Sequence, residues 1–499
     1  MKYRVFSWLK DEFRAISRAV FAFILLTGSA CAQVTQAAAI PPSFFGVSQW
    51  NPNAFPEVNF GFLAHGPFSW AEIEPAPLDF SGISLFDSYV SQAMDRGLPY
   101  YDPSTNTVNM AITLGLTPSW ATADQTRCKP TSHNGVTQCA SAPDEKQYWV
   151  DFLTYLFSYY NGKDHPYIKL YELWNEADDP GWWGGWNTAA RGPLPNEYDC
   201  PTHDTDICPL VRMAESAYTL LHNNASSMLL TPSVTGTNAE PWMKSYLAAG
   251  GDLYADGGAY HGYIGSTSSS GSYPMPDDSS APFGSVPERA ITMRRDVFNQ
   301  SRLRGKPMFQ TEGSWGNANV TDSDTQVAWL ARYYLLQAGL YESLNLKMAA
   351  WFAWDGPAGW GVIDMPSGDP SNPLVPTPAG QAYSQVYNWL EGSTVQPCNH
   401  NSKGTWKCTI QLWDGSPAEA VWYAPSNETR PYVVGAGFTS YFCLDGQSCL
   451  NGNSVSVAPG DTITITNKPI MLVGSPKLKC TGSSCCIRSG GVGSGGSCI

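Results

Sequence analysis

The chain has 499 residues, of which 43% are hydrophobic and 14% are charged. This length and composition allow a large buried core and more than one domain. The formal net charge is −14, so the surface should repel nucleic acid and anionic membranes, and we predict no nucleic-acid partner.

The N-terminal segment has the pattern of a secretory signal. Five basic side chains precede the apolar run Ala19–Leu26, and small residues follow it. The run is far shorter than the roughly 20 residues that span a bilayer, so we expect no permanent membrane span. We predict a signal peptide over residues 1–39 and an extracellular or periplasmic protein. Cleavage with lipidation at Cys31 is disfavoured, because Gly28 stands where that signal prefers Leu.

Short apolar runs then alternate with segments of helical periodicity. Eight runs are predicted strands: Phe44–Val47, Val58–Leu63, Val108–Leu114, Ile168–Leu173, Met228–Thr231, Gly258–His261, Pro307–Thr311 and Met348–Phe352. Seven segments are predicted helices: Leu85–Arg96, Asp144–Tyr160, Leu210–Asn223, Pro241–Ala249, Val286–Ser301, Asp322–Tyr341 and Ala379–Leu390. The alternation predicts a parallel sheet, and eight strands predict its closure into a (β/α)8 TIM barrel, an α/β fold, over residues 40–392.

The pattern changes after the last predicted helix. Short β-type runs separated by turn residues are Trp406–Leu412, Ala418–Tyr423, Tyr432–Val434, Tyr441–Leu444, Thr462–Ile465 and Lys468–Val473. These runs predict a C-terminal β-sandwich domain over residues 393–475. Residues 476–499 are rich in Gly, Ser and Cys, a composition typical of a disordered tail.

Thirteen cysteines in an exported chain indicate disulfide bonds. Four pairs lie close in sequence and are predicted to be bridged: Cys128 with Cys139, Cys200 with Cys208, Cys398 with Cys408, and Cys443 with Cys449. Each bridge should contribute roughly 2–3 kcal/mol in the chain-entropy description. No CxxC-like spacing with His partners is present, so we predict no metal site and no cofactor.

Two glutamates follow predicted strands. Glu176 comes after the fourth strand, in Trp174-Asn175-Glu176, and Glu312 ends the seventh. The carboxyl ends of barrel strands carry the functional residues of this fold. Two carboxylates facing each other across a cleft can hydrolyse a glycosidic bond, one as acid/base and the other as nucleophile or base. No GxSxG, phosphate-loop or HExxH motif supports an esterase, nucleotide or zinc-protease chemistry.

Five motifs carry a resemblance to a known family. Trp174-Asn175-Glu176 resembles the acid/base motif of the clan A glycoside hydrolases, whose two carboxylates follow strands four and seven. Two further motifs, Ser69–Pro75 and Thr117–Trp120, resemble the family 39 type within that clan, which is β-xylosidase- or endoglycosidase-like. Ala259–Tyr263 resembles the strand-six motif, and Trp351–Trp354 resembles the strand-eight motif. One departure is that strand two, Gly61–His65, lacks the arginine usual in the clan. Either His65 takes part of that role or the family assignment is off.

The resemblance implies roles for individual residues. Glu176 is then the general acid/base and Glu312 the nucleophile of a secreted retaining glycosidase with a carbohydrate substrate. The acid must stay protonated near neutral pH, and the nucleophile must stay ionised. Asn175 is expected to bond the sugar 2-hydroxyl, and His261 and Tyr263 to orient Glu312 and the substrate. The other residues expected to bind substrate are Trp120, Trp182, Trp183, Trp186, Trp315 and Trp354, besides His65.

Two of these expectations have alternatives. Trp182, Trp183 and Trp186 lie among glycines in one loop and could form a stacking wall for sugars, although any one of them could equally pack onto the barrel. The whole chain could also be a carbohydrate-binding surface protein without turnover, or an inverting glycosidase. The presence of both Glu176 and Glu312 disfavours the non-catalytic alternative.

Overall fold

The computed structural model describes residues 38–486. Within that range it leaves out residues 50–54, 57, 66–68, 132–134, 202–203, 224–226, 265–273, 316–319, 321, 355–375, 426–427, 445–453, 476–478 and 482–483. The predicted signal peptide therefore lies outside the described residues, apart from its last two positions.

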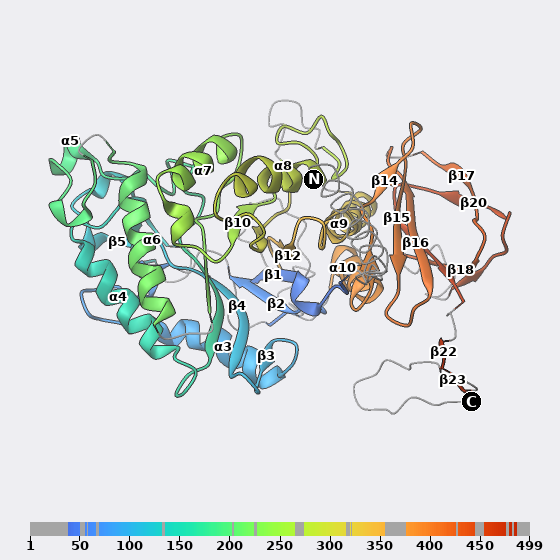
Figure 1. Ribbon diagram of the computed structural model, residues 1–499, viewed down its shortest axis with the longest axis horizontal. Coiled ribbons are helices and arrows are strands. Elements are labelled where there is room, and N and C mark those ends of the chain that lie inside the picture. The colour runs from blue at the N-terminus through green and yellow to red at the C-terminus, as the bar shows by residue number, and fades with distance from the viewer. Residues whose placement is uncertain are drawn as a thin grey trace, which may run out of the picture. The chain divides into compact units, whose positions relative to one another are not determined.

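Eight parallel strands form a nearly closed barrel (Figure 1). They are β1 (Phe45–Gln49), β2 (Phe62–His65), β4 (Thr107–Thr113), β8 (Tyr167–Glu172), β9 (Met228–Leu230), β10 (Gly258–His261), β11 (Met308–Glu312) and β12 (Leu346–Trp351). The strands are hydrogen-bonded to one another in the order β10, β11, β12, β1, β2, β4, β8 and β9. A parallel bridge between Leu230 and Gly257 spans the remaining gap from β9 to β10. The predicted TIM barrel is confirmed.

Helices connect the strands as the periodicity predicts. The longer ones are α3 (Ile83–Arg96), α4 (Lys146–Tyr159), α6 (Ile207–His222), α7 (Ala239–Ala248), α8 (Val286–Thr292), α9 (Ser323–Ala338) and α10 (Pro378–Leu390). Side chains cap the first turns of three of these helices: Ser285 and Glu288 form a capping box on α8, Asp322 caps α9, and Thr377 caps α10. The segment predicted as one helix over 286–301 changes to a π turn at Met293–Val297 and a 3-10 turn at Phe298–Gln300.

Side chains fill the interior of the barrel. Nine buried apolar residues from its strands form one cluster: Phe62, Ala64, Ala111, Leu170, Leu230, Ala259, Phe309, Met348 and Ala350. A separate and larger cluster fills the space between the strands and the helices around them. The barrel is therefore a packed core, and chemistry is confined to the loops at the carboxyl ends of its strands.

The C-terminal part is antiparallel, as predicted (Figure 1). The main sheet contains β13 (Thr394–Val395), β14 (Asn399–His400), β15 (Thr405–Gln411), β16 (Pro417–Tyr423), β18 (Phe438–Cys443), β19 (Val455–Ser456) and β21 (Ile470–Gly474). A second sheet pairs β17 (Arg430–Val433) with β20 (Thr462–Ile465). Buried side chains from both sheets, among them Val421, Ile465 and Leu472, form the core of this β-sandwich.

A buried ion pair links the barrel to the sandwich. Arg332 on α9 pairs with Asp277, and neither side chain is more than 1% exposed. The other oxygen of Asp277 accepts from Trp422 Nε1 on β16 at 3.0 Å, and Arg332 donates to the carbonyl of Ala424 at 3.3 Å. A loop, a helix and a sandwich strand are thus joined through one desolvated carboxylate.

Three predicted disulfides are present, joining Cys128 to Cys139, Cys200 to Cys208, and Cys398 to Cys408. Cys443 is also disulfide-bonded, while its predicted partner Cys449 lies outside the described residues. Within the segment predicted to be a disordered tail, two short strands, β22 (Lys479–Thr481) and β23 (Ser484–Cys486), pair as a hairpin. No helix of the described residues is both long and apolar enough to cross a membrane.

Candidate active site

Glu176 lies in a tight turn four residues beyond the end of β8. Its backbone adopts the left-handed conformation, with φ at 42°, which is costly for a residue with a side chain and is typical of functional sites. The loop after β9 holds this turn in place: Ser233 Oγ accepts from the backbone N–H of Glu176 at 3.0 Å, and the N–H of Ala177 donates to the carbonyl of Ser233 at 3.0 Å.

Glu312 is the last residue of β11 and faces His261, the last residue of β10. A register shift between Tyr260 and His261 pairs His261 with Glu312 across the two strands. The next residue must be a glycine, because a Cβ at Gly313 would lie 1.9 Å from the Tyr333 hydroxyl. This shift and this close approach fix the direction of both side chains.

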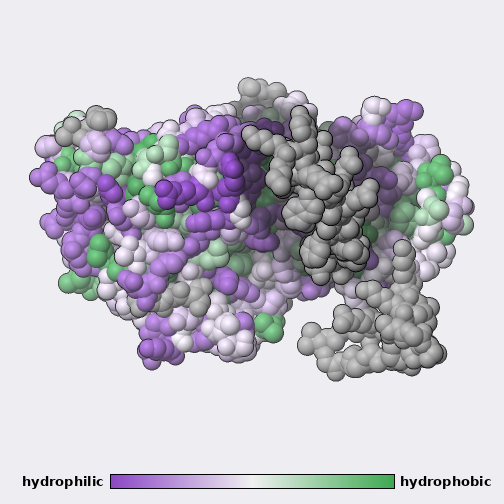
Figure 2. Space-filling view, in the orientation of Figure 1, coloured by the Kyte–Doolittle hydropathy of each residue, from purple (hydrophilic) through white to green (hydrophobic). Residues whose placement is uncertain are grey.

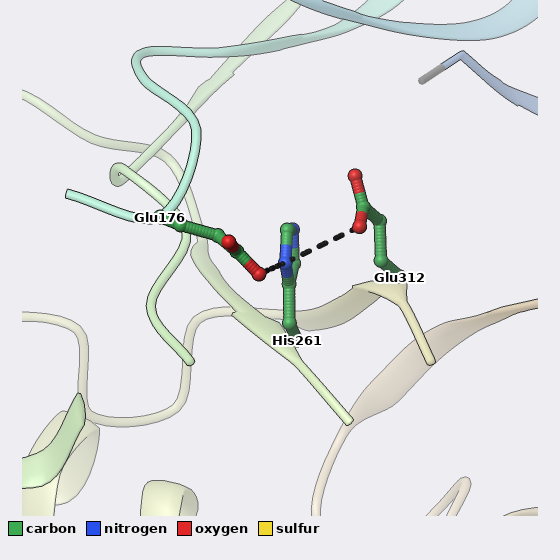
Figure 3. A group of neighbouring side chains, drawn as sticks. All are labelled: Glu176, His261 and Glu312. Atoms are coloured by element: carbon green, nitrogen blue, oxygen red, sulfur yellow. Dashed lines mark hydrogen bonds and ion pairs between the residues drawn. The ribbon is translucent and has the colours of Figure 1, made fainter. Parts of the chain in front are cut away.

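His261 lies between the two carboxylates (Figure 3). Its Nδ1 is 2.8 Å from Glu176 Oε1 and 3.5 Å from Glu312 Oε2. Carboxylate oxygens are acceptors, so Nδ1 carries a hydrogen and donates it. One oxygen of Glu176 and one of Glu312 lie within 4.8 Å of each other. The two predicted catalytic residues therefore meet at one point.

Burial and neighbouring charges shift the pKa values in this group. Burial raises the pKa of Glu312 to about 7, while the charge of His261 and the hydrogen bond from Tyr263 (3.0 Å) lower it. Burial lowers the pKa of His261, but the carboxylates of Glu312 and Glu176 outweigh it and raise the pKa to about 9. The sequence analysis predicted that Glu312 stays ionised. Burial opposes the ionised form, whereas the charge of His261 and the hydrogen bond from Tyr263 favour it.

A third carboxyl group, Glu172, lies within this group and was not singled out from the sequence. It ends β8 and is 2% exposed. Its Oε1 accepts from Thr113 Oγ1 at 3.4 Å, and its Oε2 has no partner among the described residues. Its charge raises the pKa of both His261 and Glu312. The signal in the sequence was a glutamate at the carboxyl end of a mostly apolar strand.

The other predicted site residues near the strand ends are mostly buried. Asn175 is 3% exposed and its Oδ1 has no partner among the described residues, so it is free to bond a ligand. The indole Nε1 of Trp354 is likewise buried and unpartnered, and the ring has no exposed surface. Trp315 packs against Trp329 and Trp351 and donates to the carbonyl of Pro274 at 2.7 Å. Trp315 is thus a core residue.

Of the three tryptophans predicted to stack on sugars, only Trp182 has an exposed part of its surface. Trp183 packs edge-on against Trp174 and donates to the carbonyl of Asp206. Trp186 is covered by the guanidinium of Arg191, 3.7 Å from its centroid. Both side chains are at least 95% buried, so they anchor the loop onto the protein. Trp182 is partly exposed.

A hairpin that the sequence analysis missed reaches over this loop. Strands β5 (Thr117–Pro118), β6 (Cys128–Pro130) and β7 (Thr137–Cys139) form a small sheet that the Cys128–Cys139 bridge closes. The ammonium of Lys129 on β6 lies 3.3 Å from the Trp182 ring centroid. Burial lowers the pKa of Lys129, while Asp179 and Glu176 raise it. A cation therefore lies on the loop that follows the predicted acid.

Two predicted ligand contacts lie at the ends of other barrel strands. Trp120 is partly exposed and donates to the carbonyl of Glu74 at 3.0 Å. His65 is the last residue of β2, and its side chain lies outside the described part of the structure. The structure thus does not test the role proposed for His65.

The ligand types in this group could also hold a metal ion. Glu176, His261 and Glu312 each offer one ligand atom, within 4.8 Å of one another. However, the Nδ1 atom of His261 is already hydrogen-bonded to Glu176 at 2.8 Å, and a metal would need that nitrogen without its hydrogen. Hydrogen bonds account for the grouping.

Comparison with solved structures shows which known folds the chain is similar to. The chain is similar to a family 39 glycoside hydrolase from the gut symbiont Bacteroides cellulosilyticus WH2, at 16% identity and a TM-score of 0.58 over 87% of this chain and 81% of that one. The fold is similar to that of family 39 glycoside hydrolases.

Two further structures agree. A monomeric β-xylosidase from Caulobacter crescentus CB15 matches at 13% identity and a TM-score of 0.56, over 89% of this chain and 98% of that one. A family 39 enzyme from Xanthomonas axonopodis pv. citri matches at 14% identity and a TM-score of 0.52, over 88% and 96%. No protein-family model and no curated protein matches the sequence. The resemblance of the motifs is confirmed at the level of the fold.

Proposed function

We propose that the protein is a secreted retaining glycoside hydrolase with Glu176 as general acid/base and Glu312 as nucleophile. The observation that carries the proposal is the approach of the two carboxyl groups to within 4.8 Å at the ends of barrel strands four and seven. Retaining enzymes hold these groups about 5–5.5 Å apart, whereas inverting enzymes need roughly 6.5–9.5 Å to admit a water. The spacing favours retention.

The reaction proceeds in two displacements. The Glu312 carboxylate attacks the anomeric carbon while the Glu176 carboxyl gives its proton to the departing glycosidic oxygen, so one C–O bond forms as another breaks. Glu176, now ionised, takes a proton from water, and the resulting hydroxide displaces Glu312 from the sugar. Glu176 ends protonated and Glu312 ends ionised, which restores the starting state.

His261 and Tyr263 support both states of this cycle. Tyr263 donates to Glu312 Oε2, so it stabilises the carboxylate before attack and as it leaves. His261 Nδ1–H donates to Glu176 Oε1, which leaves the other oxygen of Glu176 to carry the transferable proton. Disulfides in the described residues support export to an oxidising compartment.

Hydrolysis of a panel of 4-nitrophenyl glycosides tests the proposal, with the β-xyloside first because one structural neighbour is a β-xylosidase. Glu312→Ala should abolish turnover. Glu176→Ala should retain the first step on a substrate with a good leaving group, and azide should restore the second step. If the panel and natural polysaccharides are bound without turnover, the protein is a carbohydrate-binding relative of these enzymes. If azide rescues neither variant, the two roles are assigned wrongly.

A further inference from the structure

A second cavity lies beside helix α8, and none of its described lining residues belongs to the catalytic group. Its volume is about 550 Å³, within the roughly 300–1,000 Å³ of small-molecule sites. The loops after β9 and β10 and the helices α7 and α8 supply its walls, including Thr237, Phe283 and Arg289. Hydrophilic side chains gather over this part of the surface in Figure 2.

Arg289 is the unusual member of this wall. Its side chain belongs to a residue that is only 8% exposed. Nη1 donates to the carbonyl of Gly236 at 3.0 Å, while Nε and Nη2 have no hydrogen-bond partner among the described residues. Those two nitrogens form one edge of the planar guanidinium, the edge that binds a carboxylate or sulfate with two parallel hydrogen bonds.

Of the other three charged side chains described in the cavity wall, two form ion pairs and the third, Glu288, only accepts hydrogen bonds. Glu240 pairs with Lys244, and Arg295 pairs with Asp296. Glu288 accepts from the backbone and hydroxyl of Ser285. No carboxylate of the described residues lies within 4.0 Å of Arg289, although Asp178 and Glu240 are near enough to favour its charge.

Residues 265–273, which lie outside the described part of the loop after β10, contain no Asp or Glu. A buried cation with two unused donors is costly unless an anion satisfies it. Among the described residues the donor edge of Arg289 therefore lacks an anion, which an anionic ligand would supply.

Phe283 adds an aromatic surface beside the donor edge of Arg289. Its ring is partly exposed in the cavity, and the Arg289 guanidinium lies 5.8 Å from the ring centroid. An aromatic face beside a cation and hydroxyl groups suits a sugar ring that bears a negative charge. A free inorganic anion would fill only a small part of the volume.

We propose that this cavity is an accessory subsite for an acidic sugar residue, whose carboxylate or sulfate ester binds the Nε and Nη2 edge of Arg289. The acidic sugar would be part of the carbohydrate substrate, so this inference rests on the proposed function. The subsite and the acid/base turn share one loop, because Ser233 holds Glu176, the N–H of Thr235 donates to Asp178 Oδ1, and Gly236 holds Arg289. Glu176 and Arg289 are thus both held by one short stretch of the loop after β9.

Binding of small glycosides tests this independently of turnover. Titration calorimetry or NMR would compare methyl β-glucuronoside, methyl β-galactoside 6-sulfate and uncharged methyl β-glucoside on the full-length protein. We expect at least one charged glycoside to bind about tenfold or more tightly than the uncharged one, since hydrogen bonds to charged groups are worth about 1.5–3 kcal/mol. The two charged probes separate a carboxylate from a sulfate ester. Equal affinity for all three would overturn the proposal.

Three variants locate the effect. Arg289→Lys, which retains the charge and can still reach Gly236 O, should lose the preference for the charged probe. Arg294→Lys is the matched control: Arg294 is also buried in the same segment, but it donates to Leu344 O and does not line the cavity. Glu240→Gln removes a carboxylate from the cavity wall and should tighten binding of the charged probe alone, which keeps the test decisive if Arg289→Lys does not fold. An unchanged preference in both Arg289→Lys and Glu240→Gln would contradict the assignment.

Loss of the subsite and loss of the proposed function give different results. If the protein binds charged glycosides through Arg289 but hydrolyses none, the subsite stands and the catalytic assignment fails. If it hydrolyses aryl glycosides but binds charged and uncharged glycosides equally well, the catalytic assignment stands and the subsite proposal fails.

Discussion

At the scale of single residues, His261 decides the electrostatics of the candidate site. It is 1% exposed and lies between Glu176 and Glu312, and Glu172 adds a third carboxyl group to its surroundings. Ionisable groups that interact this strongly titrate together. A substitution at one of these residues should therefore shift the pH dependence of activity that the other residues determine.

We predict opposite pH shifts for two substitutions. Activity should rise with pH as Glu312, whose pKa is raised to about 7, becomes ionised. His261→Asn removes a charge that lowers this pKa, so the acidic limb of the kcat/KM profile should move to higher pH. Glu172→Gln removes a charge that raises it, so the limb should move to lower pH.

The pH profile of kcat/KM on one aryl glycoside checks both shifts. Tyr263→Phe serves as a control, because it removes another interaction that lowers the pKa of Glu312 and should move the limb in the same direction as His261→Asn. Shifts of the same sign for His261→Asn and Glu172→Gln would contradict this description of the site.

The sequence predicted the residues that carry a motif and missed those that act through burial. Glu176, Glu312, His261 and Tyr263 stand at strand ends with recognisable neighbours, and the structure brings them together. Glu172 has no such context, since its importance depends on the effect of its charge on His261. Distance through space between residues 172 and 261 is not readable from a single sequence.

At the scale of elements, the loop after β8 carries most of the difference between expectation and structure. Its three tryptophans look alike in sequence, but two of them bind the loop to the protein and one meets solvent. The disulfide-closed hairpin β6–β7 then places Lys129 on the face of that remaining ring. Packing partners from distant segments, not local pattern, separate these roles.

We predict different consequences for two neighbouring tryptophans. Trp183→Ala should destabilise the protein by about 3–5 kcal/mol, because it empties a buried aromatic site. Trp182→Ala should leave stability nearly unchanged but reduce turnover of oligosaccharides more than that of an aryl monosaccharide, because the lost ring would contact sugars beyond the cleavage subsite.

Thermal unfolding and the ratio of the two turnover rates measure these effects. Lys129→Ala is a useful companion, since it uncovers one face of Trp182 and should not lower oligosaccharide turnover through lost stacking. Equal losses on short and long substrates in Trp182→Ala would mean that this ring supports the loop and does not bind substrate.

The strands and long helices were predictable because each has a strong period or composition of its own. All eight barrel strands overlap their predicted positions, although β2 (Phe62–His65) shares only two residues with the predicted run Val58–Leu63. The π turn within Met293–Val297 and the short strands β5, β6 and β7 were missed. These elements are too short to show a hydrophobic period, and tertiary contacts determine their form.

At the scale of the whole molecule, Arg332 and Asp277 couple the barrel to the β-sandwich. Both side chains are desolvated, and Trp422 on the sandwich shares the same carboxylate. Neither domain's sequence pattern indicates this contact, because its members are 55 and 145 residues apart along the chain. The barrel and the sandwich could be recognised separately from the sequence, but their connection could not.

We predict that Arg332→Met lowers the free energy of unfolding by about 3–5 kcal/mol, because it leaves the Asp277 carboxylate buried without its cation. Denaturant unfolding followed by tryptophan fluorescence measures the change. Asp324→Asn is the matched control at the exposed pair with Lys468, where the loss should stay below about 1 kcal/mol. Similar losses in the two variants would show that burial of the Arg332 pair is not what matters.

The central claim is that two closely spaced carboxylates perform a double displacement. Proton NMR of the first sugar product, recorded before mutarotation, tests it most directly on any glycoside that the protein hydrolyses. A carboxyl separation within 4.8 Å predicts a product with the same anomeric configuration as the substrate. A product of inverted configuration would contradict the assignment of Glu312 as the nucleophile.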